Sequence, residues 1–236
     1  LCGDVGFGKT EVALRACFKA ILGGKQVAFL CPTTILSSQH YHTMVTRFEN
    51  FPVTIALLNR FTTTKQRKQI LSDLKEGKID LLVGTHRILS NDVVFKDLGL
   101  LCIDEEQRFG VKQKEKIKEI RKTIDVLTLT ATPIPRTLQM SLMGIRGLSQ
   151  IETPPLNRLP VQTYVMEKSN QLVKQVIERE LGRKGQVFYL HNQTANIESV
   201  ANEIARLVPQ AKIGIGHGRM SKDELEKVMQ AFVDKE

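Results

Sequence analysis

A chain of 236 residues with 42% hydrophobic residues is long enough for one large globular domain or two small ones. No apolar run approaches the roughly 20 residues of a membrane span and no secretory signal is present, so we expect a cytoplasmic protein without membrane contact. The formal charge is +9; residues 1–145 hold 21 basic and 14 acidic residues, whereas residues 146–236 hold 13 and 11. This excess in the first part weakly indicates a polyanionic partner. The four cysteines form no C-x-x-C pair, which favours buried free thiols.

Short apolar segments alternate with helical segments over the first part of the chain. The predicted strands are Gln26–Cys31, Val53–Leu58, Asp80–Thr85, Leu98–Asp104 and Asp125–Thr130. The predicted helices are Lys9–Leu22, Thr34–Phe48, Thr64–Glu76 and Lys112–Lys122. Because nearly every strand position is apolar, we expect both faces of the sheet to be covered, as in a mainly parallel, doubly wound α/β sheet. Ligands of such a sheet bind beyond the carboxyl ends of its strands.

A proline-containing segment at 146–160 interrupts this alternation and predicts an interdomain linker. The alternation then resumes, with strands at Val161–Met166, Gln186–His191 and Lys212–Gly216 and helices over 170–183, 195–207 and 221–234. The predicted fold class is therefore α/β with two domains, residues 1–145 and residues 161–236. We expect both to be truncated, because only two residues precede the first motif and the second domain has only three strands.

The first motif is the segment that fits the phosphate-binding pattern G-x-x-x-x-G-K-[ST], namely Gly3, Asp4, Val5, Gly6, Phe7, Gly8, Lys9 and Thr10. Glycines let the backbone N–H groups turn toward one anion, and the following helix adds its positive end. Lys9 is placed to reach the β- and γ-phosphates, and the Thr10 hydroxyl to bind Mg²⁺. The alternative is a glycine turn that only caps a helix. We expect a nucleoside triphosphate site here.

The second motif is an apolar strand that ends in acids, Asp104-Glu105-Glu106-Gln107. Asp104 is placed to hold Mg²⁺, directly or through water, and Glu105 to orient and deprotonate the attacking water. A solvated acidic turn is the alternative. Thr130 and Thr132 close the next strand, where small hydroxyl residues can relay the presence of the γ-phosphate, although T-x-T-P alone is also an ordinary strand exit.

These motifs together resemble those of superfamily 2 helicases. The segments GDVGFGKTEVA, PTTILSSQHY, GTHRILS, DEEQRFGVKQKEK and LTATPIPRTLQMSLMGIR stand in the family's order and spacing. More narrowly, the whole chain resembles the bacterial transcription-repair coupling factors. The junction-unwinding, branch-migrating DNA helicases are the next closest family, but they typically have serine where Phe7 stands and histidine where Gln107 stands. The resemblance implies two RecA-like P-loop domains.

The resemblance also implies roles for individual residues. The loop residues and Thr10 would hold ATP and Mg²⁺, Gln107 would sense the γ-phosphate, and Thr130 and Thr132 would couple hydrolysis to domain closure. The residues implied in contacts with the nucleic-acid backbone are Pro32, Thr33, Thr34, Thr85, His86 and Arg87. Without the resemblance, His86 and Arg87 read equally well as an exposed loop pair, and Thr33 and Thr34 as a helix cap. Double-stranded DNA is the expected partner, with RNA polymerase and excision-repair proteins reached through parts of the family outside this chain.

Two departures from the family limit what this chain is expected to do. No residue matches the arginine finger, which lies beyond the last matched motif, and Gln193 stands where the family usually has arginine. The charged stretch Lys112–Lys122 is interpreted as a solvated helix face with i,i+4 pairs. The segment Gly214–Gly218 reads equally well as a nucleic-acid contact or a tight turn. The competing hypothesis is a nucleotide-dependent DNA-binding module without turnover.

Overall fold

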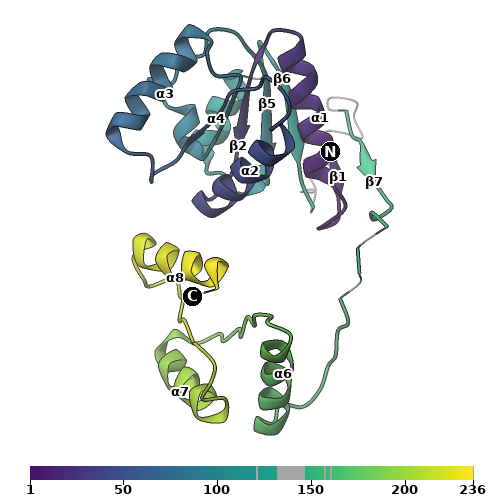
Figure 1. Ribbon diagram of the computed structural model, residues 1–236, viewed down its shortest axis with the longest axis vertical. Coiled ribbons are helices and arrows are strands. Elements are labelled where there is room, and N and C mark those ends of the chain that lie inside the picture. The colour runs from purple at the N-terminus through teal and green to yellow at the C-terminus, as the bar shows by residue number, and fades with distance from the viewer. Residues whose placement is uncertain (121, 132–146, 157, 160, 236) are drawn as a thin grey trace. The chain divides into compact units, whose positions relative to one another are not determined.

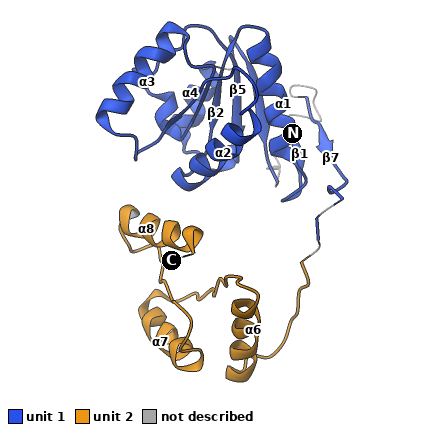
Figure 2. Ribbon diagram, in the orientation of Figure 1, with its two compact units in different colours: residues 1–159 blue, residues 160–236 orange. Residues whose placement is uncertain are grey.

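The computed structural model describes residues 1–235 except 121, 132–146, 157 and 160 (Figure 1). The chain forms two compact units, Leu1–Leu159 and Pro160–Glu236 (Figure 2). The prediction that the units correspond to a first and a second helicase domain remains a prediction.

The first unit is built on a parallel five-stranded sheet in the order β3-β4-β2-β5-β6 (Figure 1). The strands are β2 (Gln26–Leu30), β3 (Ile55–Leu58), β4 (Leu81–Gly84), β5 (Leu98–Asp104) and β6 (Asp125–Leu129). All five strands predicted for this part are confirmed, four of them with slightly shorter bounds. Every residue of β2 and β4 is buried, as expected for strands covered on both faces.

Two further short strands extend this sheet past β6. β1 (Cys2–Gly3) lies beside the end of β6, where the Gly3 N–H donates to Thr130 O at 3.2 Å. β7 (Gln150–Ile151) pairs in parallel with β1. The segment 146–160 was predicted as linker, yet this part of it adds a strand to the first unit. Two residues are too few for an apolar pattern to reveal them.

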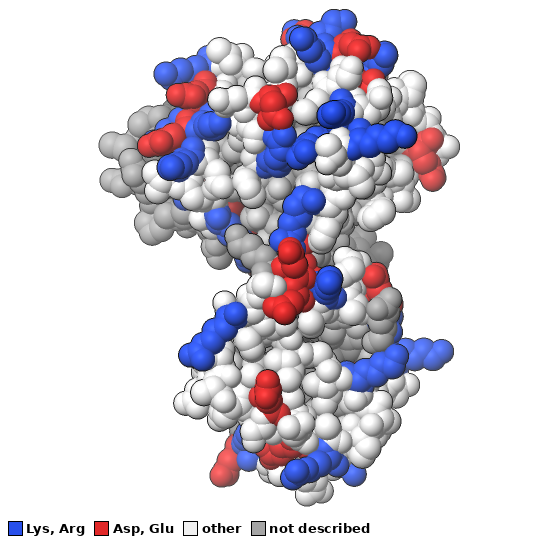
Figure 3. Space-filling model, turned by 90° about the vertical axis from the view of Figure 1, so that its left-hand side faces the viewer, with Lys and Arg blue, Asp and Glu red and all other residues white. Residues whose placement is uncertain are grey.

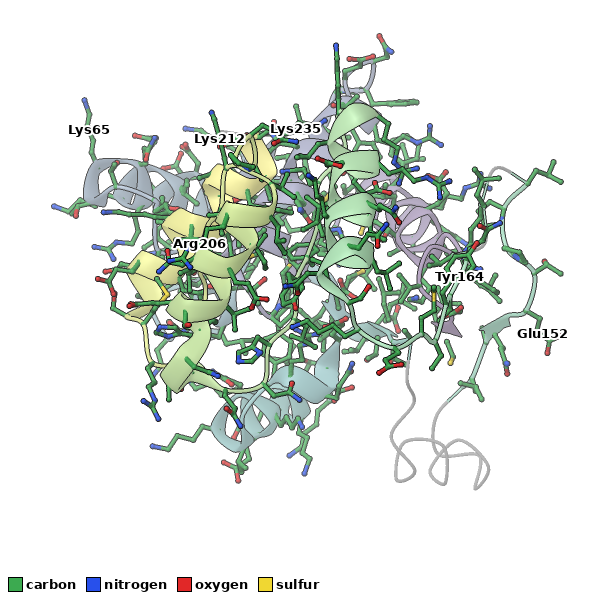
Figure 4. The ribbon with its side chains drawn as sticks, turned by 90° about the horizontal axis from the view of Figure 1, so that it is seen from below. Lys65, Glu152, Tyr164, Arg206, Lys212 and Lys235 are labelled. Atoms are coloured by element: carbon green, nitrogen blue, oxygen red, sulfur yellow. The ribbon has the colours of Figure 1, made fainter. Side chains whose placement is uncertain are left out.

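Helices cover both faces of the sheet. The residues of α1 (Lys9–Leu22) and α2 (Thr34–Arg47) join one apolar core, and those of α3 (Thr64–Glu76) and α4 (Val111–Ile120) join the other. Side-chain caps set two of the helix starts: Thr33 accepts from the Leu36 N–H at 3.2 Å, and Thr63 forms a capping box with Gln66. Outward positions such as Lys65 on α3 point into solvent (Figure 4). All four cysteines are buried free thiols, as predicted.

The second unit contains α6 (Asn170–Gly182), α7 (Ile197–Leu207) and α8 (Lys222–Asp234) in its described part. The three predicted helices are confirmed. The three predicted strands are wrong for the described residues, because none of these segments joins a ladder with another. A strand requires a hydrogen-bonded neighbour, which β-branched composition alone does not supply. Val165 and Leu190 are accordingly 97% and 90% exposed, whereas Ile177 and Ile204 form a small helical core.

In the described residues, no helix combines the length and the apolar character needed to cross a bilayer.

Gly84 provides a test of the sheet geometry. A Cβ added there would lie 2.1 Å from Leu58 O on the neighbouring strand, so β3 and β4 can pair this closely only through glycine. We expect Gly84→Ala to lower the free energy of unfolding by about 1–3 kcal/mol, as overpacking does elsewhere. Urea denaturation measures this. Gly147→Ala is the matched control, since a Cβ at 147 meets nothing within 4 Å; an equal loss in both variants would contradict the explanation.

Candidate functional site

The parallel register brings every predicted motif of the first unit to one edge of the sheet. The carboxyl ends follow one another as β3, β4, β2, β5, β6 and β1. The segments leaving them are, in this order, Asn59–Phe61, Thr85–Arg87, Pro32–Thr34, Asp104–Gln107, Thr130 and the loop from Gly3 to Thr10. The predicted nucleotide groups therefore occupy one half of the edge and the predicted nucleic-acid groups the other half (Figure 1).

The loop from Gly3 to Thr10 turns directly into α1. Gly8 is the N-cap with φ 86°, a left-handed conformation that disfavours any side chain. Lys9 Nζ donates to Gly3 O at 2.7 Å and to Asp4 O at 2.8 Å, so the ammonium lies over its own loop. Lys9 therefore stands within the loop that the pattern assigns to phosphate.

Arg158, which sequence reasoning missed, also contacts this loop. Its Nη2 lies 3.2 Å from Asp4 Oδ2, and its guanidinium lies 4.9 Å from the Phe7 ring centre. A cavity of about 590 Å³ opens beside the loop; it is lined by Cys2, Gly3, Asp4, Phe7, Ala131, Leu148, Gln150, Ile151 and Glu152. Figure 4 shows Glu152, just after β7, pointing outward. An arginine in a proline-containing segment carries no periodic signal, so this contact could not be predicted from the sequence.

The acids occupy the end of β5. Asp104 Oδ2 lies 3.0 Å from His40 Nε2, and both side chains are mostly buried. Glu105 has φ 49°, which costs a non-glycine residue about 1–3 kcal/mol and is typical of functional sites. Its Oε2 is buried and forms an ion pair with Arg108, so the arginine holds one side of the carboxylate.

One strand separates the acids from the phosphate loop. The Glu105 N–H donates to Leu129 O on β6 at 3.0 Å, and β6 adjoins β1, so the two motifs emerge about 10 Å apart at strand spacing. Thr130 lies between them, bonded through its backbone to Leu1 and Gly3. Gln107 is half-buried in the short turn after the acids, and Thr132 lies outside the described residues.

The donors at this end of the sheet fit a magnesium ion. Thr10 and Asp104 supply a hydroxyl and a carboxylate oxygen, the ligand type that Mg²⁺ prefers, and Mg²⁺ usually completes its shell with phosphates and water. In the described part of the chain, no group of three or more His, Cys, Asp or Glu residues is arranged so that it could hold a metal ion by itself. The donor set thus suits an ion shared with a nucleotide better than an all-protein metal cage.

The predicted nucleic-acid residues differ in how accessible they are. Thr33 and His86 are exposed, whereas Thr34 and Thr85 are buried at 7% and 6% exposure. Thr34 is the first residue of α2, so its backbone N–H, rather than its hydroxyl, is the group available for a phosphate.

Arg87, the remaining cation of this set, has a partner that sequence reasoning missed. It forms a bidentate pair with Asp92, with Nη1 2.7 Å from Oδ1. The hydrogen bond from Arg87 lowers the pKa of the Asp92 carboxyl below its usual value. The pair holds the guanidinium fixed at the edge of the sheet. Asp92 follows the predicted motif by five residues, a spacing that carries no signal outside a helix.

The loop after β3 was also missed. Phe61 is 61% exposed, and the Arg60 guanidinium lies 5.3 Å from its ring centre. The sequence signal that could have identified this loop is a basic residue next to an aromatic one at the end of a strand, a combination common in nucleic-acid binding. On the face in Figure 3, basic and acidic side chains are interspersed over both units rather than gathered into one basic band.

Comparisons with known proteins agree with this geometry. The chain is 61% identical over its whole length to the transcription-repair-coupling factor of Bacillus subtilis (strain 168) and 57% identical to that of Staphylococcus aureus (strain USA300), and it spans 20% of the length of each. It also matches the structure of RecG bound to a three-way DNA junction, with a TM-score of 0.80 and 35% identity over 99% of this chain and 31% of that chain. This neighbour has the RecA-like helicase fold that the sequence predicts for the present chain.

The family model described as DEAD/DEAH box helicase matches residues 1–141, which is more than half of the sequence. This chain therefore belongs to the DEAD/DEAH box helicase family.

Proposed function

We propose that this chain is the motor core of an ATP-dependent double-stranded DNA translocase of the transcription-repair coupling type. The observation that carries the proposal is the shared edge of the first unit, where a phosphate loop and an acid pair adjoin residues suited to DNA phosphates. The similarity to transcription-repair-coupling factors at 61% identity supports the narrower assignment.

Different side chains of the site have different roles in the proposed ATP hydrolysis. Lys9 exchanges the carbonyls of Gly3 and Asp4 for the β- and γ-phosphates when ATP enters the loop. Thr10 and Asp104 would hold Mg²⁺, which neutralises charge developing on the phosphates when it is bound. Glu105 orients a water molecule and accepts its proton, and attack on the γ-phosphate releases ADP and phosphate.

The remaining residues link hydrolysis to movement. Gln107 senses the γ-phosphate, and Thr130 and Thr132 pass this state on to domain closure. Pro32, Thr33, Thr34, Thr85, His86 and Arg87 hold the DNA backbone without reading bases, which a motor that moves over any sequence requires. In the whole protein, repeated steps displace stalled RNA polymerase, and excision-repair proteins are then recruited.

A junction-unwinding helicase is the second candidate, favoured by the match to RecG. The identity of 35% to RecG against 61% to the coupling factors places it second. A third possibility is DNA binding without turnover by this chain alone. Robust DNA-stimulated ATP hydrolysis by the 236-residue chain would exclude it.

The role of Glu105 can be tested in the whole protein. We expect Glu105→Gln to lower the ATP hydrolysis rate by about 10²–10⁴-fold, since it removes a general base. ATP affinity, measured with a fluorescent analogue, should stay near wild type because the loop is intact. Lys9→Ala is the contrasting variant and should weaken both affinity and rate. Hydrolysis by Glu105→Gln at the wild-type rate would show that another group activates the water.

The DNA role of Arg87 can be tested by the salt dependence of binding. Arg87→Ala should weaken duplex binding uniformly across sequences and reduce the slope of log affinity against log salt by about 1. Fluorescence anisotropy titrations at several salt concentrations measure this. Lys78→Ala is the control, because Lys78 precedes β4 and so lies at the opposite edge of the sheet. An unchanged slope in Arg87→Ala would rule out a phosphate contact.

A further inference from the structure

His40 connects helix α2, which begins at the predicted DNA-contacting segment, with Asp104 of the predicted nucleotide site. It lies on α2, and its Nε2 is 3.0 Å from Asp104 Oδ2 at the end of β5. The side chains of His40 and Asp104 are only 12% and 16% exposed. On the other side, the imidazole packs against Phe29 of β2, with ring centres 4.9 Å apart. His40 is therefore held in one position by a buried aromatic ring and a carboxylate.

The hydrogen bond has one direction when Asp104 is ionised. A carboxylate only accepts, so Nε2 carries the proton and donates it to Oδ2. This contact occupies Oδ2 and fixes the plane of the carboxylate, which leaves Oδ1 as the other oxygen for a cation. Hydrogen bonds to a metal-binding carboxylate commonly set its orientation in this way.

The helix that carries His40 begins at the predicted DNA-contacting segment. Thr33 caps α2 and Thr34 is its first residue. His40 follows Thr34 by six residues, about 9 Å along the helix axis at 1.5 Å per residue. An α-helix transmits a displacement of its first turn over such a length, because the residues between are tied by hydrogen bonds and packed on the sheet. A movement of the amino end of α2 therefore reaches Asp104 through one side chain.

We propose that His40 is a positioning residue: it orients Asp104 for Mg²⁺ and transmits DNA contact at the start of α2 to the nucleotide site. The inference rests on the proposed function and adds the route by which DNA stimulates hydrolysis. His40 touches neither nucleotide nor metal in this role, and it acts only through Asp104.

Variants at position 40 separate positioning from packing. His40→Phe keeps the ring beside Phe29 but removes the donor. His40→Gln places an amide N–H near the position of Nε2, whereas His40→Asn is equally polar but too short to reach Asp104. His42→Phe is the control, because His42 is exposed on the same helix and contacts only the Tyr41 ring among the contacts found in the described residues.

Each variant is measured in the whole protein by Mn²⁺ binding in the presence of ADP, followed by electron paramagnetic resonance, and by ATP hydrolysis against Mg²⁺ with and without duplex DNA. Thermal unfolding is recorded alongside. We expect His40→Phe and His40→Asn to weaken Mn²⁺ binding about tenfold or more and to lose most DNA stimulation. The Mn²⁺ affinity and the DNA stimulation of His40→Gln should stay within about threefold of wild type. Those of His42→Phe should equal the wild-type values.

The outcomes separate this inference from the proposed function. If wild type shows no Mg²⁺-dependent hydrolysis, the proposed function fails. If wild type is active and stimulated by DNA but His40→Asn binds Mn²⁺ and responds to DNA normally, only the inference is overturned. Equal losses in His40→Gln and His40→Asn, in step with a lower unfolding temperature, indicate a packing role and also overturn it. If His40→Phe fails to fold, the comparison of His40→Gln with His40→Asn still tests whether the hydrogen bond to Asp104 is required.

Discussion

The parallel register of the sheet is the constraint on which the site depends. Because β4, β2, β5, β6 and β1 all run the same way, their carboxyl ends meet at one edge, and each motif needs only to follow its own strand. A buried amide at the opposite edge helps to fix this register. Gln26 donates to Leu74 O and Ile79 O and accepts from the Asp97 N–H, which ties the start of β2 to the segments entering β4 and β5. A fully satisfied buried network of this kind favours a single alignment.

Much of the first unit could be predicted because its signals are local. Runs of apolar residues revealed the five main strands, and the motif G-x-x-x-x-G-K-[ST] located the turn into α1 that we propose as a phosphate loop. The missed features join residues far apart in the chain: Arg158 with Asp4, and His40 with Asp104. No pattern in a single sequence encodes such pairs, since neither partner is unusual in its own segment. In the second unit the helices were predictable from their periodicity, whereas residues of the predicted strands, such as Leu190, join no β-ladder in the described part of the chain and remain exposed.

The site combines a strained residue with a rigid frame. Glu105 has a left-handed backbone, which costs stability, and its buried Oε2 is ion-paired with Arg108. The strand residues before it, Leu100–Ile103, pair with both β2 and β6, and Ile103 is completely buried. A rigid strand followed immediately by a strained residue holds the carboxylate in position before any ligand arrives. In the proposed reaction, that preorganisation lowers the reorganisation required.

The neighbours of Asp104 complete this picture of its charge. His40 supplies one hydrogen bond, and Cys31 lies close enough for the two groups to interact electrostatically. Burial, together with the Asp104 charge, raises the pKa of the Cys31 thiol well above its usual value, so the thiol stays neutral near pH 7. A neutral thiol adds no second negative charge beside the Asp104 side chain. The mostly buried Asp104 side chain therefore has a hydrogen bond to His40 and an uncharged thiol as neighbours, and charges interact more strongly in such a low-dielectric setting than at the surface.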